Sequence, residues 1–169
     1  MIPKIDNILY TTGLGSGTPH VFRYALSLAQ KYDAKIHIIH GHEPMTPGAQ
    51  HVADLYMVEG TTGDVYERAI VEIDKRIHER LERLCAKETG SDPQGLERVA
   101  SITIAKLPPK QAILEEAKKR QVDLIVMGSH RHSVLSDAML GSTTLKVLHS
   151  ATIPVLVVRI PDNFQEEGF

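Results

Sequence analysis

The segment Asp123-Leu124-Ile125-Val126-Met127-Gly128-Ser129 (residues 123–129) decides the fold class of this chain. After its leading acid the segment is a continuous apolar run up to Met127, which is typical of a strand that is covered on both faces of a parallel sheet. A second apolar run at residues 153–158 follows, and the residues between 138 and 149 fit a helix. Because a strand, a helix and a strand in succession imply parallel pairing, this half of the chain predicts an α/β fold.

The same alternation extends toward the N-terminus. Strands are predicted at residues 5–12, 34–40 and 98–104, where β-branched residues dominate or apolar and polar residues alternate. Helices are predicted from Thr18, with Thr18 as N-cap and Pro19 as first helical residue, and at residues 64–87 and 108–120. Residues 43–62 predict an irregular connection beside the ligand crevice, and residues 90–95 predict a loop.

Length and composition limit the classes of protein that this chain can belong to. A chain of 169 residues is long enough for one core, so we expect one domain at residues 1–160 and a polar C-terminal tail at residues 161–169 that frays. A net charge of -2 provides no basic excess for nucleic acid or for an acidic membrane surface. No apolar stretch approaches the roughly 20 residues of a membrane span, and no secretory signal begins the chain. We therefore expect a cytoplasmic protein that binds neither nucleic acid nor membrane.

Two glycine-bearing segments are candidates for the ligand crevice, which in an open parallel sheet lies at the C-terminal ends of the strands. The first, Gly13 to Gly17, lets the backbone approach an anion, but it lacks the spacing of a dinucleotide fingerprint and also suits a plain turn. The second is Met127 to Ser133, followed by Gly141-Ser142-Thr143-Thr144, which could present hydroxyls and backbone N–H groups at the same mouth.

The second segment also carries a resemblance to a known family. The chain resembles the universal stress protein family over essentially the whole domain, through Ile8-Leu9, residues 24–29, 123–130, 140–142, 146–148 and 153–158. This resemblance implies an open five-stranded parallel sheet in the order 3-2-1-4-5 with helices on both faces, the adenine-nucleotide alpha-hydrolase-like fold. It also implies a stress-responsive regulatory protein, with ATP, ADP or AMP as ligand, Mg²⁺ accompanying the nucleotide, and the last strand pairing with its copy in a homodimer.

Nucleotide-binding members of that family resemble one another in a run of Gly, two residues, Gly, nine residues, Gly, then Ser or Thr, with an Asp just after the first strand. Gly128, Gly141 and Ser142 match this run in register, but Arg131 occupies the middle glycine position and Gly13 the position of the Asp. Arg131 either obstructs the pocket with its side chain or clamps a phosphate with its guanidinium group. The nucleotide-binding residues that the resemblance implies are Thr11, Gly13, His40, Met127, Gly128, Arg131, Gly141, Ser142 and Thr143.

The remaining reactive side chains lead to weaker hypotheses. His40 with His42, and His130 with His132, are spaced so that each pair shares one face of a strand, which suits metal ligands, but neither pair has a Cys or carboxylate at a useful spacing. Cys85 lies on an apolar helix stripe and is interpreted as a buried hydrophobic residue. No Asp/Glu pair marks the crevice, so no catalytic residue is predicted. The alternatives to a regulatory nucleotide binder are a weak ATPase or autophosphorylating protein and an interaction module without ligand.

Overall fold

The computed structural model describes residues 2–43, 46, 62–90, 92–129, 140–161, 164 and 166. Within these residues five parallel strands form one sheet in the order β3-β2-β1-β4-β5. The strands are β1 (Asn7–Thr11), β2 (Lys35–Gly41), β3 (Val99–Ala105), β4 (Leu124–Ser129) and β5 (Val155–Arg159). The predicted α/β fold and strand order are therefore confirmed. The order reverses at β1, which pairs with β2 on one side and β4 on the other, and this reversal places the C-terminal ends of β1 and β4 together.

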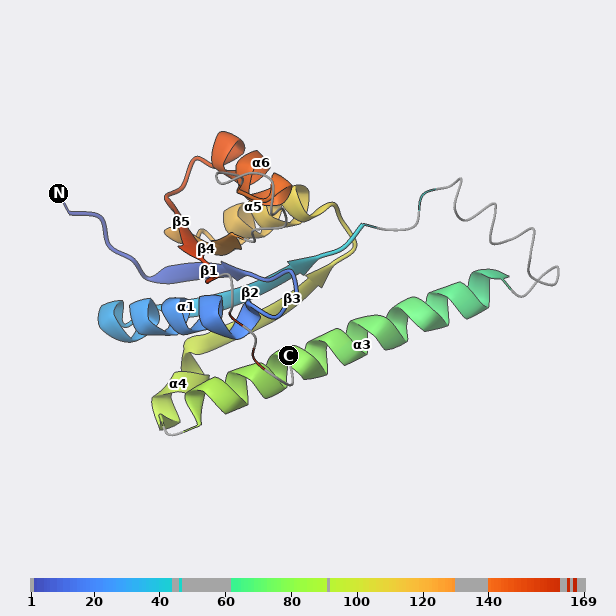
Figure 1. The fold of residues 1–169 in the computed structure, drawn as a ribbon, viewed down its shortest axis with the longest axis horizontal. Coiled ribbons are helices and arrows are strands. Elements are labelled where there is room, and N and C mark those ends of the chain that lie inside the picture. Colours follow the sequence, from blue (N-terminus) through green and yellow to red (C-terminus); the bar gives the residue numbers. More distant parts are fainter. Residues whose placement is uncertain are drawn as a thin grey trace.

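Helices cover both faces of this sheet (Figure 1). One face carries α1 (Thr18–Tyr32) and α3 (Thr62–Thr89), and the other carries α5 (Pro109–Lys119) and α6 (Ser142–Ser150). The short helix α4 (Pro93–Arg98) contacts α1 and α3. The N-terminal half of α3 extends beyond the sheet, whereas its C-terminal half packs against the core through the buried residues Leu81 and Leu84.

Two apolar clusters hold these layers together. Alternation along β1 directs Tyr10 toward α1 and α3 and Leu9 toward α5 and α6, and both side chains are fully buried. The ring of Tyr10 packs on Phe22 of α1, with ring centroids 5.2 Å apart. Cys85 belongs to the α1/α3 cluster, where burial raises the pKa of its thiol to about 12. The interpretation of Cys85 as a buried hydrophobic residue is thus confirmed.

Some element boundaries differ from the sequence-based expectations for local reasons. Thr18 is the first residue of α1, and Gly17 is its N-cap, because the Thr18 hydroxyl is directed to the Thr12 hydroxyl 3.3 Å away. The predicted loop at residues 90–95 is wrong from residue 93 onward, where α4 begins. There the Asp92 side chain accepts a hydrogen bond from the N–H of Gln94 at 3.0 Å. Aspartate is common both in turns and at helix N-caps, and here Asp92 caps a short helix. Most of the connection predicted at residues 43–62 lies outside the described residues.

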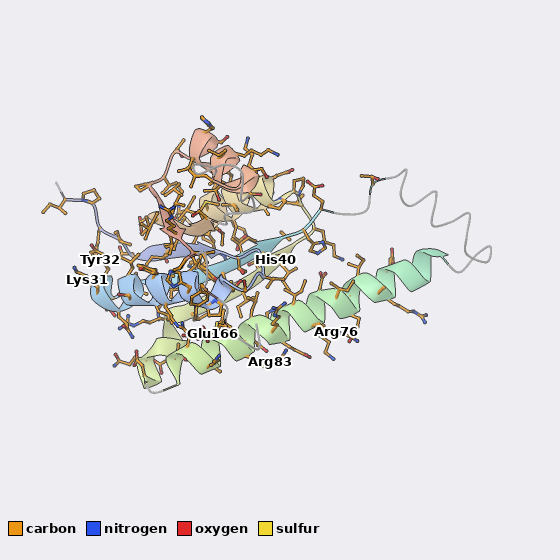
Figure 2. The ribbon with its side chains drawn as sticks, viewed as in Figure 1. Lys31, Tyr32, His40, Arg76, Arg83 and Glu166 are labelled. Carbon is orange, nitrogen blue, oxygen red and sulfur yellow. The ribbon has the colours of Figure 1, made fainter. Side chains whose placement is uncertain are left out.

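The C-terminal tail contacts the domain at two described positions. Phe164 packs on the His20 ring of α1, with ring centroids 5.0 Å apart, and Glu166 forms ion pairs with Arg23 of α1 and Lys87 of α3, both at 2.8 Å. Figure 2 shows Glu166 beside α3. The expectation that the tail frays is therefore wrong for Phe164 and Glu166, because an aromatic ring and a carboxylate find partners on two neighbouring helices. The domain boundary at residue 160 stays a prediction.

No helix in the described part of the chain has the length and hydropathy of a membrane span.

Close packing at Gly41 provides a test of this arrangement. A Cβ at Gly41 would lie 2.8 Å from the Cβ of Ala112 and 3.0 Å from the backbone of Pro109, whereas a Cβ at Gly13 would meet no atom of a described residue within 4 Å. We expect Gly41→Ala to lower the free energy of unfolding by about 1–3 kcal/mol through overpacking, because a backbone atom cannot move aside cheaply. The matched Gly13→Ala should be neutral or stabilising by up to about 1 kcal/mol. Urea unfolding of both variants makes the comparison, and equal stabilities would contradict it.

Candidate functional site

A cleft of about 270 Å³ opens at the C-terminal ends of β1 and β4, where the strand order reverses. Its walls come from the β1–α1 turn, the ends of β2 and β4, and the beginnings of α1, α5 and α6. The lining residues are Tyr10, Thr11, Thr12, Gly13, Gly17, Thr18, Val21, Ile39, Gly41, Pro109, Ile113, Met127, Gly128, Gly141, Ser142, Thr143, Thr144 and Ile160. The cleft therefore lies where open parallel sheets generally bind ligands.

The β1–α1 turn is held by side-chain hydrogen bonds. The Thr12 hydroxyl accepts the N–H of Leu14 at 3.0 Å, which accommodates the left-handed backbone of Leu14 at a φ of 59°. Thr18 connects the other end of the turn, because its carbonyl accepts a hydrogen bond from the Tyr10 hydroxyl at 2.9 Å. The turn therefore has a defined shape without help from a ligand.

The helices that begin at the cleft differ in what they offer to an anion. In α1 the N–H of Thr18 already donates to the Gly15 carbonyl at 3.0 Å, and Pro19 has no N–H. In α6 the N-cap Gly141 provides no side chain, and among the described residues no acceptor meets the N–H groups of Ser142 and Thr143. Within the part of the chain that the structure describes, the N-terminus of α6 therefore combines donors without an acceptor with the positive end of a helix dipole.

Gly128 has a packing role in addition to its place in the cleft. A Cβ at this position would lie 2.8 Å from Val21 and 3.1 Å from the Cδ1 of Ile160. Its carbonyl accepts a hydrogen bond from the Thr144 hydroxyl at 3.2 Å, which ties the end of β4 to the first turn of α6. A glycine is thus required here by the protein's own packing, whether or not a ligand approaches. A Cβ at Gly13, in contrast, would meet no described residue within 4 Å.

The structure brings most of the predicted site residues together. Thr11, Gly13, Met127, Gly128, Gly141, Ser142 and Thr143 all line the cleft. Arg131 lies outside the described residues, as do His130 and His132, so both hypotheses for Arg131 stay predictions. Sequence reasoning missed Ile160, which follows the last strand, and Pro109 with Ile113, which begin the helix after β3. The position of α5 directly after a strand end was the available signal for the last two.

His40 does not line the cleft and lies behind it. Its ring is buried on the α3 side of the sheet (Figure 2), and its Nδ1 donates to the Thr12 carbonyl at 2.9 Å. The His42 ring lies on the same face as predicted, with ring centroids 6.1 Å apart, and its Nε2 contacts Asp74 at 3.1 Å. Despite this neighbourhood, no group of three His, Cys, Asp or Glu side chains in the described ranges has the arrangement of a metal site.

The chemistry of the described lining is that of a binding site. Its side chains are hydroxyls from Tyr, Thr and Ser, together with apolar groups and bare glycine backbone. None of these described lining side chains is a carboxylate, an imidazole or an amine that could act as a general acid or base near neutral pH. The lining can donate hydrogen bonds to an anion and pack against an apolar ring.

Comparison with known proteins extends this description. The model of the universal stress protein family matches residues 4–159. The universal stress protein A homolog 2 of Coxiella burnetii is 36% identical over 140 residues, covering 80% of this chain and 82% of the relative. The universal stress protein YxiE of Bacillus subtilis is 33% identical over 136 residues, covering 80% of this chain and 86% of the relative.

Solved structures share the fold. The universal stress protein UspA from Lactobacillus plantarum superposes with a TM-score of 0.63 at 20% identity, covering 94% of this chain and all of that one, and such structures have the adenine-nucleotide alpha-hydrolase-like fold. A universal stress protein solved with cAMP has a TM-score of 0.54 at 16% identity, covering 93% and 98% of the two chains. One from Archaeoglobus fulgidus, solved with dAMP, has a TM-score of 0.51 at 12% identity and covers 90% and 96%.

The hydrogen bond between Thr144 and Gly128 can be tested directly. We expect Thr144→Val to lower the free energy of unfolding by about 1 kcal/mol, because the change keeps the volume of the side chain and leaves the Gly128 carbonyl without this donor. Thr143→Val is the matched control, since no described residue is hydrogen-bonded to the Thr143 hydroxyl and its side chain is more exposed. Chemical denaturation monitored by circular dichroism compares the two, and equal losses would show that the hydrogen bond does not stabilise the cleft.

Proposed function

Because this chain belongs to the universal stress protein family, we propose that it is a cytoplasmic regulatory protein whose cleft binds an adenine mononucleotide. The observation that carries the proposal is the N-terminus of α6, where N–H groups that have no acceptor among the described residues border a cleft beside the end of β4. Phosphate binds readily to such a helix end, since both the donors and the dipole favour an anion. Two family structures that share this fold were solved with cAMP and dAMP, which supports adenine nucleotides as the class of ligand.

The size and composition of the cleft favour one mononucleotide. Pockets for small molecules generally measure about 300–1,000 Å³, and the described cleft, at about 270 Å³, lies just below this range. The apolar side chains of Ile39, Met127 and Ile113 provide surface for a purine ring, while Ser142 and Thr143 provide donors for phosphate. We therefore favour AMP, ADP or ATP over a dinucleotide.

Mg²⁺ would accompany the nucleotide and would not be held by a protein cage. Magnesium prefers carboxylate, phosphate and water oxygens, and the described lining contains no carboxylate. Gly13 stands at the position where nucleotide-binding relatives carry an Asp, and the described residues leave room there for a side chain. We expect Gly13→Asp to fold normally and to make nucleotide affinity more dependent on Mg²⁺ than it is in the wild type.

Ser142 offers the sharpest test of nucleotide binding. Ser142→Asp should weaken ATP, ADP and AMP at least about tenfold, because a carboxylate at the first residue of α6 repels phosphate where the donors are. The same change suits a helix N-terminus, so the thermal stability should stay or rise. Ser142→Asn is the matched control, because asparagine is nearly isosteric with aspartate and carries no charge.

Calorimetry of the three proteins with each nucleotide measures this difference. Mass spectrometry of the natively purified protein shows in addition whether a nucleotide copurifies with it. Wild-type protein that binds none of the three, or an Asp variant that binds as well as the wild type, would contradict the proposal. Phosphate release during the same titrations would instead favour the alternative of a weak ATPase. Transfer of a labelled phosphate from ATP to the protein would favour autophosphorylation.

We also propose a homodimer through β5. This strand is the outermost one on its side of the sheet, and Val155 and Val157 are only partly buried. The neighbouring helix α6 exposes Leu145 and Leu148, so an apolar surface adjoins the open edge. An uncovered apolar edge favours pairing with a second strand, and Pro154 before β5 is compatible with an edge position.

Light scattering at tens of micromolar should show a dimer for the wild type and a monomer for Val155→Asp/Val157→Asp. Both valines are partly buried against the apolar cluster under α5 and α6, and a second strand over this edge would enclose the carboxylates further. Ala100→Asp is the control, since Ala100 is exposed on β3 at the opposite edge of the sheet. Circular dichroism establishes that each variant is folded. A monomeric wild type, or a folded double variant that remains dimeric, would overturn this interface.

A further inference from the structure

Ile160 occupies the space that side chains at two glycines of the cleft would otherwise fill. A Cβ at Gly17 would collide with the Cδ1 of Ile160 and would lie 2.9 Å from both its Cγ1 and its Cγ2. A Cβ at Gly128 would lie 3.1 Å from the same Cδ1. Ile160 is only 8% exposed, and it also lines the cleft. A single side chain after the last strand therefore closes the cleft between the start of α1 and the end of β4.

This wall and the first turn of α6 border the cleft from opposite faces of the sheet. Ile160 belongs to the apolar cluster under α1 and α3, whereas Val147 of α6 belongs to the cluster under the other face. Gly128 lies between them, because its carbonyl accepts the Thr144 hydroxyl at 3.2 Å while its Cβ position is directed at Ile160. A phosphate group at the N-terminus of α6 would therefore have Ile160 on the opposite wall.

Contacts with α1 hold the wall in place. The carbonyl of Arg159, in the peptide that leads into Ile160, accepts a hydrogen bond from the Nε2 of His20 at 3.3 Å. The His20 ring packs against Tyr24, with centroids 5.3 Å apart, and against Phe164 of the tail, with centroids 5.0 Å apart. The backbone before Ile160 and the tail after it are thus both attached to α1, so that a ligand cannot easily push the Ile160 side chain aside.

The donors of the described lining suit one phosphate group. A phosphate monoester carries a charge of about -1.5 to -2 and three strong acceptor oxygens. The N–H groups and hydroxyls of Ser142 and Thr143 can supply donors for these oxygens. The described lining contains no cationic side chain for the charge of further phosphates and no carboxylate for a metal ion that would accompany them.

We infer that Ile160 is the specificity-determining residue of the cleft: it closes the α1 side against a longer phosphate chain, so that the ligand is a nucleoside monophosphate. This choice among nucleotides rests on the proposed function, whereas the position of the wall does not. The selectivity comes from an apolar side chain that lies beyond the last strand and that makes no hydrogen bond to any ligand.

The ligand arm of the test is calorimetry with AMP, ADP and ATP in one magnesium-containing buffer, in which the metal ion neutralises part of the extra charge. The wild type should bind AMP at least about tenfold more tightly than ATP, because a closed wall rejects the longer chain. Ile160→Ala opens the space between Gly17 and Gly128, and it should lower this ratio at least about fivefold, mainly through tighter ATP binding.

Two further variants keep the comparison decisive. Ile160→Val removes one methyl group and should lower the ratio by a smaller factor, so it answers the question if the Ala variant does not fold. Val158→Ala is the matched control, because Val158 lies two residues earlier on β5, is buried in the same apolar cluster and does not line the cleft. It should keep the wild-type ratio.

The ligand-free arm is a double-mutant cycle on stability, measured by chemical denaturation. Gly17→Ala should raise the unfolding equilibrium constant at least about fivefold in the wild type, because its Cβ collides with Ile160. In the Ile160→Ala or Ile160→Val background the same change should raise it clearly less. Gly13→Ala is the control, since a Cβ there meets no described residue within 4 Å, and its effect should be the same in every background.

The two arms fail in different ways. An equal effect of Gly17→Ala in all backgrounds would overturn the position of Ile160 as the wall. A wild type that binds ATP as tightly as AMP, or Ile160 variants with the wild-type ratio, would overturn its role in specificity. If none of the three nucleotides binds, the proposed function fails and the choice of a monophosphate fails with it, while the stability cycle still decides whether Ile160 closes the cleft.

Discussion

The parallel pairing of β1 with both β2 and β4 is the constraint on which the rest of the structure depends. It requires β1 to be apolar on both faces, and Ile8, Leu9 and Tyr10 are fully buried. It also forces the connections after β1 and β4 to opposite faces of the sheet, so that α1 and α6 begin on either side of one gap. The cleft is the consequence of that reversal, and no single residue creates it.

Buried polar groups give the cleft its shape. Leaving a buried hydroxyl or imidazole without a partner costs about 1–3 kcal/mol, so the turn after β1 adopts the conformation in which its polar groups are paired. Thr12 takes part in most of this pairing, with contacts to Leu14, Thr18 and His40. The turn is thereby organised before any ligand arrives, which reduces the entropy that binding must offset. The first turn of α6 has no comparable set of internal partners among the described residues, and its donors face the cleft.

The C-terminal segment completes the wall on the α1 side. Ile160 fills the space between Gly17 and Gly128, where any larger residue at either glycine would collide with it. Beyond it, Glu166 joins Arg23 and Lys87, and Arg23 also pairs with Glu88 at 2.6 Å, so that α1, α3 and the tail share one network of charges. The Arg23 side chain is about half exposed, and each exposed pair contributes at most about 1 kcal/mol. Their combined effect is to hold the tail in place more than to stabilise the domain.

The sequence by itself determined the α/β class, the strands and long helices, and the glycine and hydroxyl residues at the strand ends, because apolar periodicity and helix-start residues are local signals. The resemblance carried by residues 123–158 added the strand order. Only the tertiary structure decided that His40 supports the Thr12 carbonyl from behind, that Ile160 closes the wall, and that α6 has more N–H groups without an acceptor among the described residues than α1 has. These facts depend on contacts between elements that are far apart in the chain. The identity of a residue does not show whether its N–H group or its ring is already hydrogen-bonded to another group.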